Sequence, residues 1–306
     1  MLTTSVESGI MLPANPLVKY VLVSALLKAQ LHHNIKISHF LVNGTHIHFI
    51  VRVINPEDIP GFMERFKTES AHYLNRLLGR KQRTIWCKRY DMSACLEYTD
   101  VINRIVYIYN NPVKDGLISS IDLYPGLSSW QRFKSNKSYI KGALLSRRNI
   151  KPVEQVPGEK QFEHHRKGLS KKRKVRILEI DPNDWMKAFD IDDPKEINEL
   201  ILSSIEENRK DIHEIRLAND KKHYLGSSKL RNQEIDLSYE PQRSGRKMWC
   251  YSKNKEKRAR YISWVKSLVS EAREVYQEWL RGNTSQRMPI GMLAPRMPVQ
   301  GNLIFC

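Results

Sequence analysis

Apolar residues in the first third of the chain change their spacing several times, and each spacing is typical of one kind of element. A stretch that starts near residues 13–16 and runs to about 33, and a second over 59–78, carry them every three to four positions. This spacing predicts two helices, and Gly79 is a typical stop for the second. Runs rich in β-branched and aromatic residues predict strands at 2–10, 35–42, 45–53 and 84–90.

The order of these elements predicts a fold class. Strand, helix, strand, strand, helix, strand is the order of a ferredoxin-like α+β sandwich. Such a fold has an antiparallel sheet with both helices on one face. The other face of the sheet then remains available for a functional site.

Two histidines mark the strand predicted at 45–53. Successive side chains on a strand point to opposite faces, so His46 and His48 share one face. The dipeptide Asn43-Gly44 just before them favours a tight hairpin turn, because it accepts positive φ angles. Two imidazoles about 7 Å apart along one face can converge on a divalent metal ion. The alternative is a pair of structural histidines, and we favour the metal site.

Residues 99–111 predict a further helix, with its N-cap at residue 99 or 100 and its end at Pro112. Asn103, Tyr107 and Asn111 are four residues apart and therefore share one polar face. Tyr109 falls on the apolar stripe instead. The polar face can present a phenol and a carboxamide together to a ligand. Alternatively, Tyr107 is an ordinary surface tyrosine and Asn111 is the C-terminal residue of the helix.

The charge of the chain points to a polyanionic partner. Its 306 residues carry a formal net charge of +18, and 41% of them are hydrophobic, which is typical of a globular protein. Nucleic acid is the first candidate partner and an anionic membrane the second. The most apolar stretch, residues 20–27, is too short to span a bilayer, and the first residues lack the pattern of a secretory signal. Four cysteines without CxxC spacing fit a reducing compartment. We expect a cytoplasmic, nucleoid-associated protein without a membrane partner.

Several short motifs occur together in one order. They are the His-hydrophobe-His strand, the run Trp86-Cys-Lys-Arg-Tyr90, and the run Tyr107-Ile-Tyr-Asn-Asn-Pro-Val-Lys-Asp-Gly-Leu117. The set resembles the REP-associated tyrosine transposases, relatives of the single-strand transposases of small bacterial insertion sequences within the HUH endonuclease superfamily. Two positions depart from the family's pattern: most members have Pro-Asn-His where this chain has Asn43-Gly-Thr-His46, and Asp115 replaces a commoner small residue.

The resemblance implies a specific chemistry. The family's nucleophilic tyrosine falls on Tyr107, and its metal-binding side chains fall on His46, His48 and Asn111. A Mg²⁺ or Mn²⁺ ion at these residues would polarise a phosphodiester of single-stranded or hairpin DNA. Attack by the tyrosine would leave a 5′-phosphotyrosine link and a free 3′-OH. Because the link conserves the phosphoester, a second strand can be joined to it, which makes the enzyme a strand transferase.

Basic and aromatic residues near this site are candidates for DNA recognition. Trp86 and Tyr90 can stack on unpaired bases, while Lys88, Arg89 and Arg104 contact phosphates. The alternative is that Trp86 belongs to the core and that Lys88 and Arg89 form a solvated edge.

Composition changes after residue 131. We expect a catalytic domain at 1–131, a basic linker at 132–176 and a mainly helical, basic accessory region for nucleic-acid binding at 177–306, with helices from 193 and over 256–280. Dense basic runs are often solvated tails, but phosphate contact is an equal alternative here. The side chains expected to make it are Lys171, Lys172, Arg173, Lys174, Arg243 and Arg246.

Two other functions remain open at this point. One is a hairpin-DNA-binding protein of the same fold that no longer cleaves, and the other is a metal-dependent nuclease that forms no covalent intermediate. The retention of the tyrosine, both histidines and the asparagine favours the transposase chemistry over a pure binder. The long basic C-terminal half favours a monomer, with a dimer as the alternative.

Overall fold

The computed structural model describes residues 1–7, 9–81, 84–152, 175–233, 238, 248–290 and 292. The strands are β1 (Leu2–Ser5), β2 (Ile35–Val42), β3 (His46–Val53), β4 (Asp91–Met92), β5 (Ala94–Cys95), β6 (Tyr139–Ala143), β7 (Val175–Glu179) and β8 (Cys250–Tyr251). The helices are α1 (Pro16–His32), α2 (Asp58–Leu77), α3 (Tyr98–Lys114), α4 (Trp130–Lys134), α6 (Pro194–Ala218), α7 (Ser227–Asn232) and α8 (Lys255–Leu280). Short 3-10 turns are η1 (Ile121–Leu123), η2 (Arg147–Asn149) and η6 (Asp184–Phe189).

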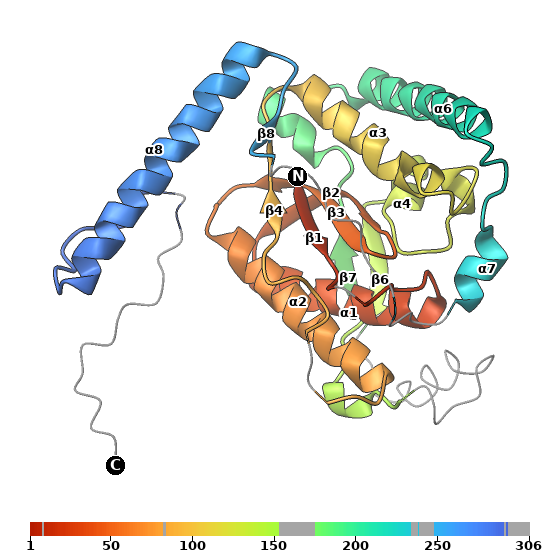
Figure 1. Ribbon diagram of the computed structural model, residues 1–306, viewed down its shortest axis with the longest axis horizontal. Helices are drawn as coiled ribbons and strands as arrows, with labels where there is room; N and C mark the ends of the chain where they lie inside the picture. The colour runs from red at the N-terminus through yellow and green to blue at the C-terminus, as the bar shows by residue number, and fades with distance from the viewer. Residues whose placement is uncertain are drawn as a thin grey trace.

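The first four strands form the sheet that the sequence predicts. Their order is β2-β3-β1-β4 and all neighbours are antiparallel, with α1 and α2 both packed on one face (Figure 1). This arrangement confirms the predicted α+β, ferredoxin-like fold. Phe49 of β3 lies at the centre of the core, with ring centroids 6.2 Å from Phe62 and 6.0 Å from Phe66 of α2. Ring contacts of this kind fix the helix layer against the sheet.

The fourth strand differs from the prediction of a strand over 84–90. Only an isolated bridge pairs Val6 with Trp86, and β4 itself is two residues long at 91–92. The reason is a competing helix contact. Lys67 of α2 donates to the carbonyls of Cys87 and Lys88 at 2.6 and 3.2 Å, which draws these groups away from a strand ladder.

A second layer covers the opposite face of the sheet. Ile50 of β3 points to this side and packs in a second core with Ile105 and Ile108 of α3. Helix α3 has its N-cap two to three residues earlier than predicted, at Glu97, which forms a capping box with Asp100. It also continues past Pro112 to residue 114. A proline inside a helix disturbs only the preceding turn, and the burial of Val113 in the core favours the continued helix.

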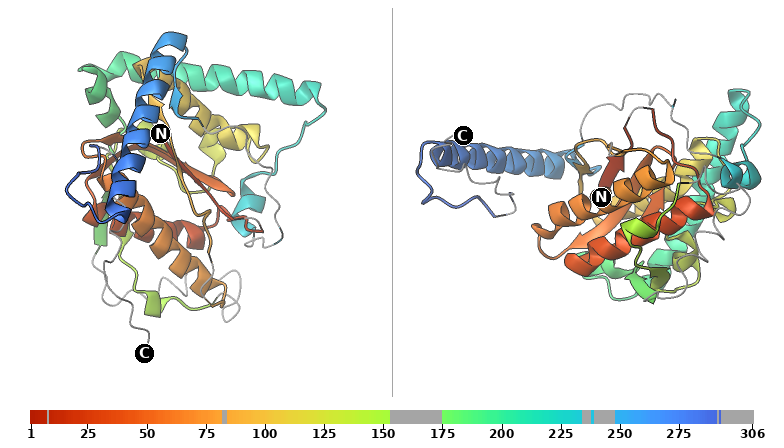
Figure 2. Two further views of the ribbon diagram at one scale, coloured as in Figure 1. Left: turned by 60° about the vertical axis from the view of Figure 1, so that its left-hand side comes forward. Right: turned by 90° about the horizontal axis from the view of Figure 1, so that it is seen from below.

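Much of the predicted linker and accessory region packs on this body. The ribbon of β6 and β7 lies against α1, and α6 lies against α3, where Asn110 donates to the Ile205 carbonyl at 2.9 Å. Helix α8 instead projects away from the rest, as Figure 1 and the right-hand view of Figure 2 show. The helices from 193 and over 256–280 are confirmed as α6 and α8. None of the helices in the described ranges is both long and apolar enough to cross a membrane.

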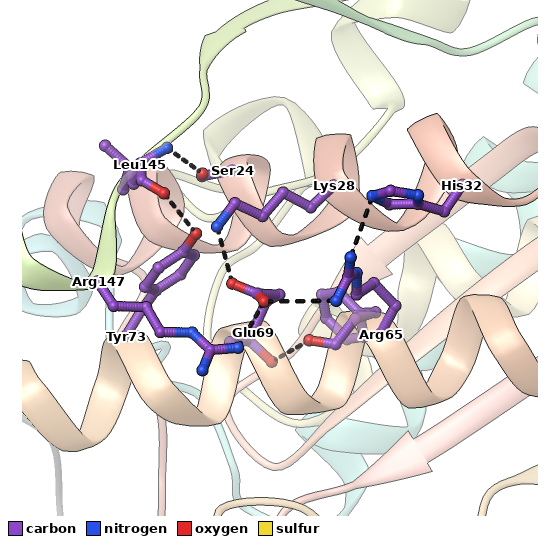
Figure 3. A network of polar contacts seen from close by, with 10 residues as sticks. Ser24, Lys28, His32, Arg65, Glu69, Tyr73, Leu145 and Arg147 are labelled. Atoms are coloured by element: carbon purple, nitrogen blue, oxygen red, sulfur yellow. Dashed lines mark hydrogen bonds and ion pairs between the residues drawn. The ribbon is translucent and has the colours of Figure 1, made fainter.

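A buried carboxylate ties α1, α2 and the chain after β6 together (Figure 3). The side chain of Glu69 is 4% exposed and accepts from Lys28 at 2.9 Å and from Arg147 at 2.6 Å. Beside it, the Tyr73 hydroxyl donates to the Leu145 carbonyl at 3.0 Å. These contacts attach the segment after β6 to the helix layer.

Candidate active site

The two histidines of β3 face α3 and converge on one of its side chains. Ile47 between them is fully buried in the core beneath α1 and α2, so the imidazoles emerge on the other face. The Nε2 atoms of His46 and His48 lie 3.1 and 3.2 Å from the same atom, Nδ2 of Asn111. The structure therefore brings together the three residues that the resemblance assigns to a metal ion.

The opposite nitrogen of each imidazole has its own hydroxyl partner. His46 Nδ1 lies 2.8 Å from Oγ1 of Thr45, and His48 Nδ1 lies 3.0 Å from Oγ1 of Thr3 on β1. A hydroxyl that accepts from Nδ1–H fixes the tautomer in which Nε2 keeps a free lone pair. Such partners behind the ring orient histidine ligands in metal sites.

Burial keeps both imidazoles in their neutral form. It lowers the pKa of His46, which Asp115 opposes in part. The pKa of His48 is held well below its ordinary value by burial first, and then by His46 and Arg104. Neutral imidazole is the form that binds a metal ion.

The donor set fits a divalent metal ion. In the described part of the chain, His, Cys, Asp and Glu nowhere gather in groups of three, so a metal ion at this site would take its third side-chain ligand from the Asn111 amide. The Asn111 oxygen accepts from Asn43 Nδ2 at 3.1 Å, while its nitrogen faces the histidines. A half-turn of the amide exchanges the two atoms and directs the oxygen to the point where the imidazoles meet. Two imidazoles and one amide oxygen suit Mn²⁺ as well as Mg²⁺.

Tyr107 stands directly beside this cluster. Its ring meets the ring of His48 edge-on at a centroid distance of 5.5 Å, and the side chain is half-buried. Burial raises the pKa of its phenol, and Asp115 and Tyr251 add to this, whereas Arg104 and Asn111 oppose it. Two cations approach the ring, Arg104 at 5.2 Å and Lys114 at 5.8 Å from its centroid. The phenol is therefore neutral at ordinary pH and needs help to act as a nucleophile.

A cavity of about 730 Å³ gives access to the cluster. Its lining includes both histidines, Tyr107, Lys114 and Asp115. Its volume lies in the range of ligand-binding sites.

Tyr109, two residues along, is 0% exposed and has a different environment. Its hydroxyl lies 2.8 Å from His39 Nδ1 and 2.9 Å from Ser129 Oγ, deep in the second core. Of the two tyrosines in the motif, only Tyr107 reaches the cavity, as the predicted helical faces require.

Part of the chain is similar to a known protein family. Residues 15–111, about a third of the chain, match the family model described as IS200-like transposase. This segment is therefore similar to the IS200-like transposases, and the predicted resemblance is confirmed at this level.

One solved structure also matches. It is the REP-associated tyrosine transposase bound to a REP hairpin, similar at 21% identity over 51% of this chain and 83% of that chain, with a TM-score of 0.37. A search of curated proteins finds no match to the chain.

The recognition residues predicted within residues 1–131 are dispersed. Trp86 is 3% exposed and donates from Nε1 to Ser70 Oγ at 2.8 Å. It therefore belongs to the core, and the prediction that it stacks on bases is wrong. Tyr90 is half-buried against the same core. Lys88 and Arg89 are exposed but do not line the cavity at Tyr107. Only Arg104 lies at the site. The basic residues at 171–174, 243 and 246 lie outside the described residues.

Sequence reasoning missed a second network at this site. Asn43, in the segment that departs from the family's pattern, contacts Asp115, the other departure: Asn43 Nδ2 donates to Asp115 Oδ2 at 2.6 Å as well as to Asn111. Neither residue of Asn43-Gly44 adopts a positive φ, so the expected turn geometry is wrong. Gly44 instead allows close approach, because a Cβ there would lie 3.1 Å from Met11 Cγ. In the sequence, the available signal of this network was that the segment before His46 and Asp115 both depart from the family's pattern.

Proposed function

We propose that the domain is a DNA strand transferase that cleaves single-stranded DNA next to a hairpin through Tyr107. The Tyr107 oxygen attacks the phosphorus of a phosphodiester, and the bond between phosphorus and the 3′-oxygen breaks. The phenol gives up its proton, and the departing 3′-oxygen takes one up. The products are a 5′-phosphotyrosine and a 3′-OH, and the same steps in reverse join the phosphate to another 3′-OH.

His46, His48 and Asn111 would hold Mg²⁺ or Mn²⁺ in this reaction. The ion supplies Lewis-acid polarisation of the phosphate. Lys114 lies on the same cavity wall as Tyr107 and meets the negative charge of the attacked phosphate. In the structure Asn43 donates to the Asn111 oxygen and to Asp115, which fixes the end of α3 against the hairpin before β3. When the Asn111 amide turns its oxygen to the ion, the first of these bonds is lost and the second remains.

One observation carries the proposal. A half-buried tyrosine lies edge-on against one of two neutral histidines whose Nε2 atoms meet at a single amide, and the tyrosine and both histidines border one cavity. A protein that only binds DNA has no need for this convergence. The family of the domain supports a transposase-type activity on DNA.

A denaturing gel tests the proposal. The probe is a labelled imperfect DNA hairpin with single-stranded extensions, taken from the DNA that flanks the gene, incubated with Mn²⁺. We expect a protein–DNA adduct that survives denaturation and is lost in Tyr107→Phe and on addition of a chelator. Cleavage that persists in Tyr107→Phe would identify a nuclease without a covalent intermediate. Retarded mobility without any cleavage would identify a binding protein.

A further inference from the structure

A second cleft lies beside Tyr107. Its volume is about 420 Å³, and α3 forms one wall with Asn103, Arg104 and Tyr107. The other wall comes from the C-terminal half, from Met248, residues 250–253 and Arg258. Among the described residues, Tyr107 is the only one that lines both this cleft and the cavity with the histidines. The nucleophile therefore stands at the border between two hollows.

The C-terminal wall is fixed to the transposase domain by several bonds. Strand β8 pairs in parallel with β5, so that Cys250 lies opposite Ala94. The Leu96 N–H donates to the Tyr251 carbonyl at 3.3 Å. At the start of α8, Lys257 Nζ contacts Glu97 Oε1, the N-cap residue of α3, at 2.6 Å. The cleft is thus built by two parts of the chain that are far apart in sequence.

The described lining of the cleft carries three cations, Arg104, Lys253 and Arg258, and one carboxylate, Asp100, so positive charge is in excess. The Arg104 guanidinium lies between two rings, 4.4 Å from the centroid of Tyr251 and 5.2 Å from that of Tyr107. Its Nε is buried without a hydrogen-bond partner in the described part of the molecule. Lys253 and Arg258 also form no ion pair there. The carboxylate of Asp100, also on the lining, accepts from the Glu97 N–H in the capping box.

Cations beside aromatic rings are the usual means of holding single-stranded nucleic acid. Bases stack on aromatic rings, and Arg and Lys contact the phosphates between them. A strand attacked at Tyr107 has to pass this residue, so its two flanks enter the two hollows. The first hollow holds the histidine cluster, and the second offers Tyr251, Arg104, Lys253 and Arg258 to the flank.

We propose that the cleft between α3 and residues 248–258 binds the single-stranded DNA on one side of the scissile phosphate. Tyr251 stacks on a base, and Arg104, Lys253 and Arg258 contact the adjoining phosphates. The C-terminal half thereby completes the DNA path of the transposase domain. This inference rests on the proposed function for the identity of the strand, but its binding step is measurable without cleavage.

A binding assay with a chelator present tests the cleft. The fluorescence anisotropy of a blunt DNA hairpin is compared with that of the same hairpin carrying a single-stranded extension. We expect the double variant Tyr251→Leu, Arg258→Gln to lose affinity for the extended hairpin by about tenfold, as the loss of a stacked base predicts, and to bind the blunt hairpin unchanged. The control Arg273→Gln removes an exposed cation from the same helix outside the cleft and should bind both probes as the wild type does. An equal loss on both probes, or no loss on either, overturns the proposal.

Cross-linking of the unaltered chain guards against misfolding of the variant. 5-Iodouracil is placed at successive positions of the extension, and the cross-linked peptides are identified by mass spectrometry. We expect one position to attach to the peptide that contains Tyr251, whereas attachment only to other peptides contradicts the proposal. If the wild type forms no covalent adduct but retains this cross-link and the preference for the extension, then the proposed reaction fails and the cleft stands.

Discussion

Replacing Glu69 by glutamine should destabilise the protein in a manner that depends on pH. The carboxylate lies between α1 and α2, almost fully buried, with cations on both of its oxygens (Figure 3). Burial alone would raise the pKa of Glu69, but hydrogen bonds from Arg147 and Lys28 outweigh it and lower the pKa from 4.5 to about 2. Glutamine keeps the shape of the side chain and removes the charge.

The expected loss follows from the pKa. At about 1.4 kcal/mol for each tenfold change in proton affinity, the lowered pKa corresponds to about 3 kcal/mol of stability. Arg147 is 42% exposed and Lys28 is 23% exposed, so solvent screening reduces the contribution. We expect Glu69→Gln to lower the free energy of unfolding by about 2 kcal/mol and the melting temperature by about 4–8 °C at neutral pH.

The pH dependence gives the sharper test. Because the folded pKa is depressed, the contribution is present above the unfolded pKa and is lost as the pH falls from 4.5 toward about 2. Thermal melts followed by circular dichroism should show the gap between wild type and Glu69→Gln narrowing across this range. The matched control is Glu206→Gln, which removes a half-exposed carboxylate paired with Arg209 and should change little. If both variants melt alike at neutral pH, or if the Glu69 gap persists unchanged in acid, the reasoning is refuted.

Three further predictions concern the site. Tyr109→Phe removes a hydroxyl buried between His39 and Ser129, so thermal melts should show a free energy of unfolding lower by about 1–3 kcal/mol. Adduct formation on the gel should persist, and its loss in a folded variant would contradict the roles assigned to the two tyrosines. Mn²⁺ should raise the melting temperature of the wild type but not that of His48→Asn, measured by scanning fluorimetry, and an equal rise in both would place the metal elsewhere. Because burial lowers the pKa of His46 and His48, lowering the pH should not reduce the rate of DNA cleavage with a midpoint at 6.5, the ordinary histidine value. A midpoint at 6.5 in a pH–rate profile would show that the imidazoles are exposed.

The periodicity of the sequence was sufficient for the fold and for the central cluster. Alternation along β3 places His46 and His48 on one face of the strand. The four-residue spacing along α3 places Tyr107 and Asn111 on one face of the helix. These rules are local and depend only on the geometry of a strand and a helix. That α3 lies over the histidine face of β3 then follows from the ferredoxin-like order, because α1 and α2 occupy the opposite face of the sheet.

The remaining features depend on contacts between distant residues. Trp86 looks like a base-stacking residue in sequence, but a hydrogen bond to Ser70 and packing on Phe66 place it in the core. The bond between Asn43 and Asp115 joins residues 72 positions apart. Tyr251 reaches Arg104 only because β8 pairs with β5, and two-residue strands leave no pattern in a sequence.

The most direct test of the central claim locates the covalent bond. Wild-type protein is incubated with the extended hairpin and Mn²⁺, digested with nuclease and trypsin, and analysed by tandem mass spectrometry. The account predicts a nucleotide attached through its 5′-phosphate to Tyr107. Attachment to Tyr109 instead, or cleaved DNA without any modified tyrosine, would contradict it.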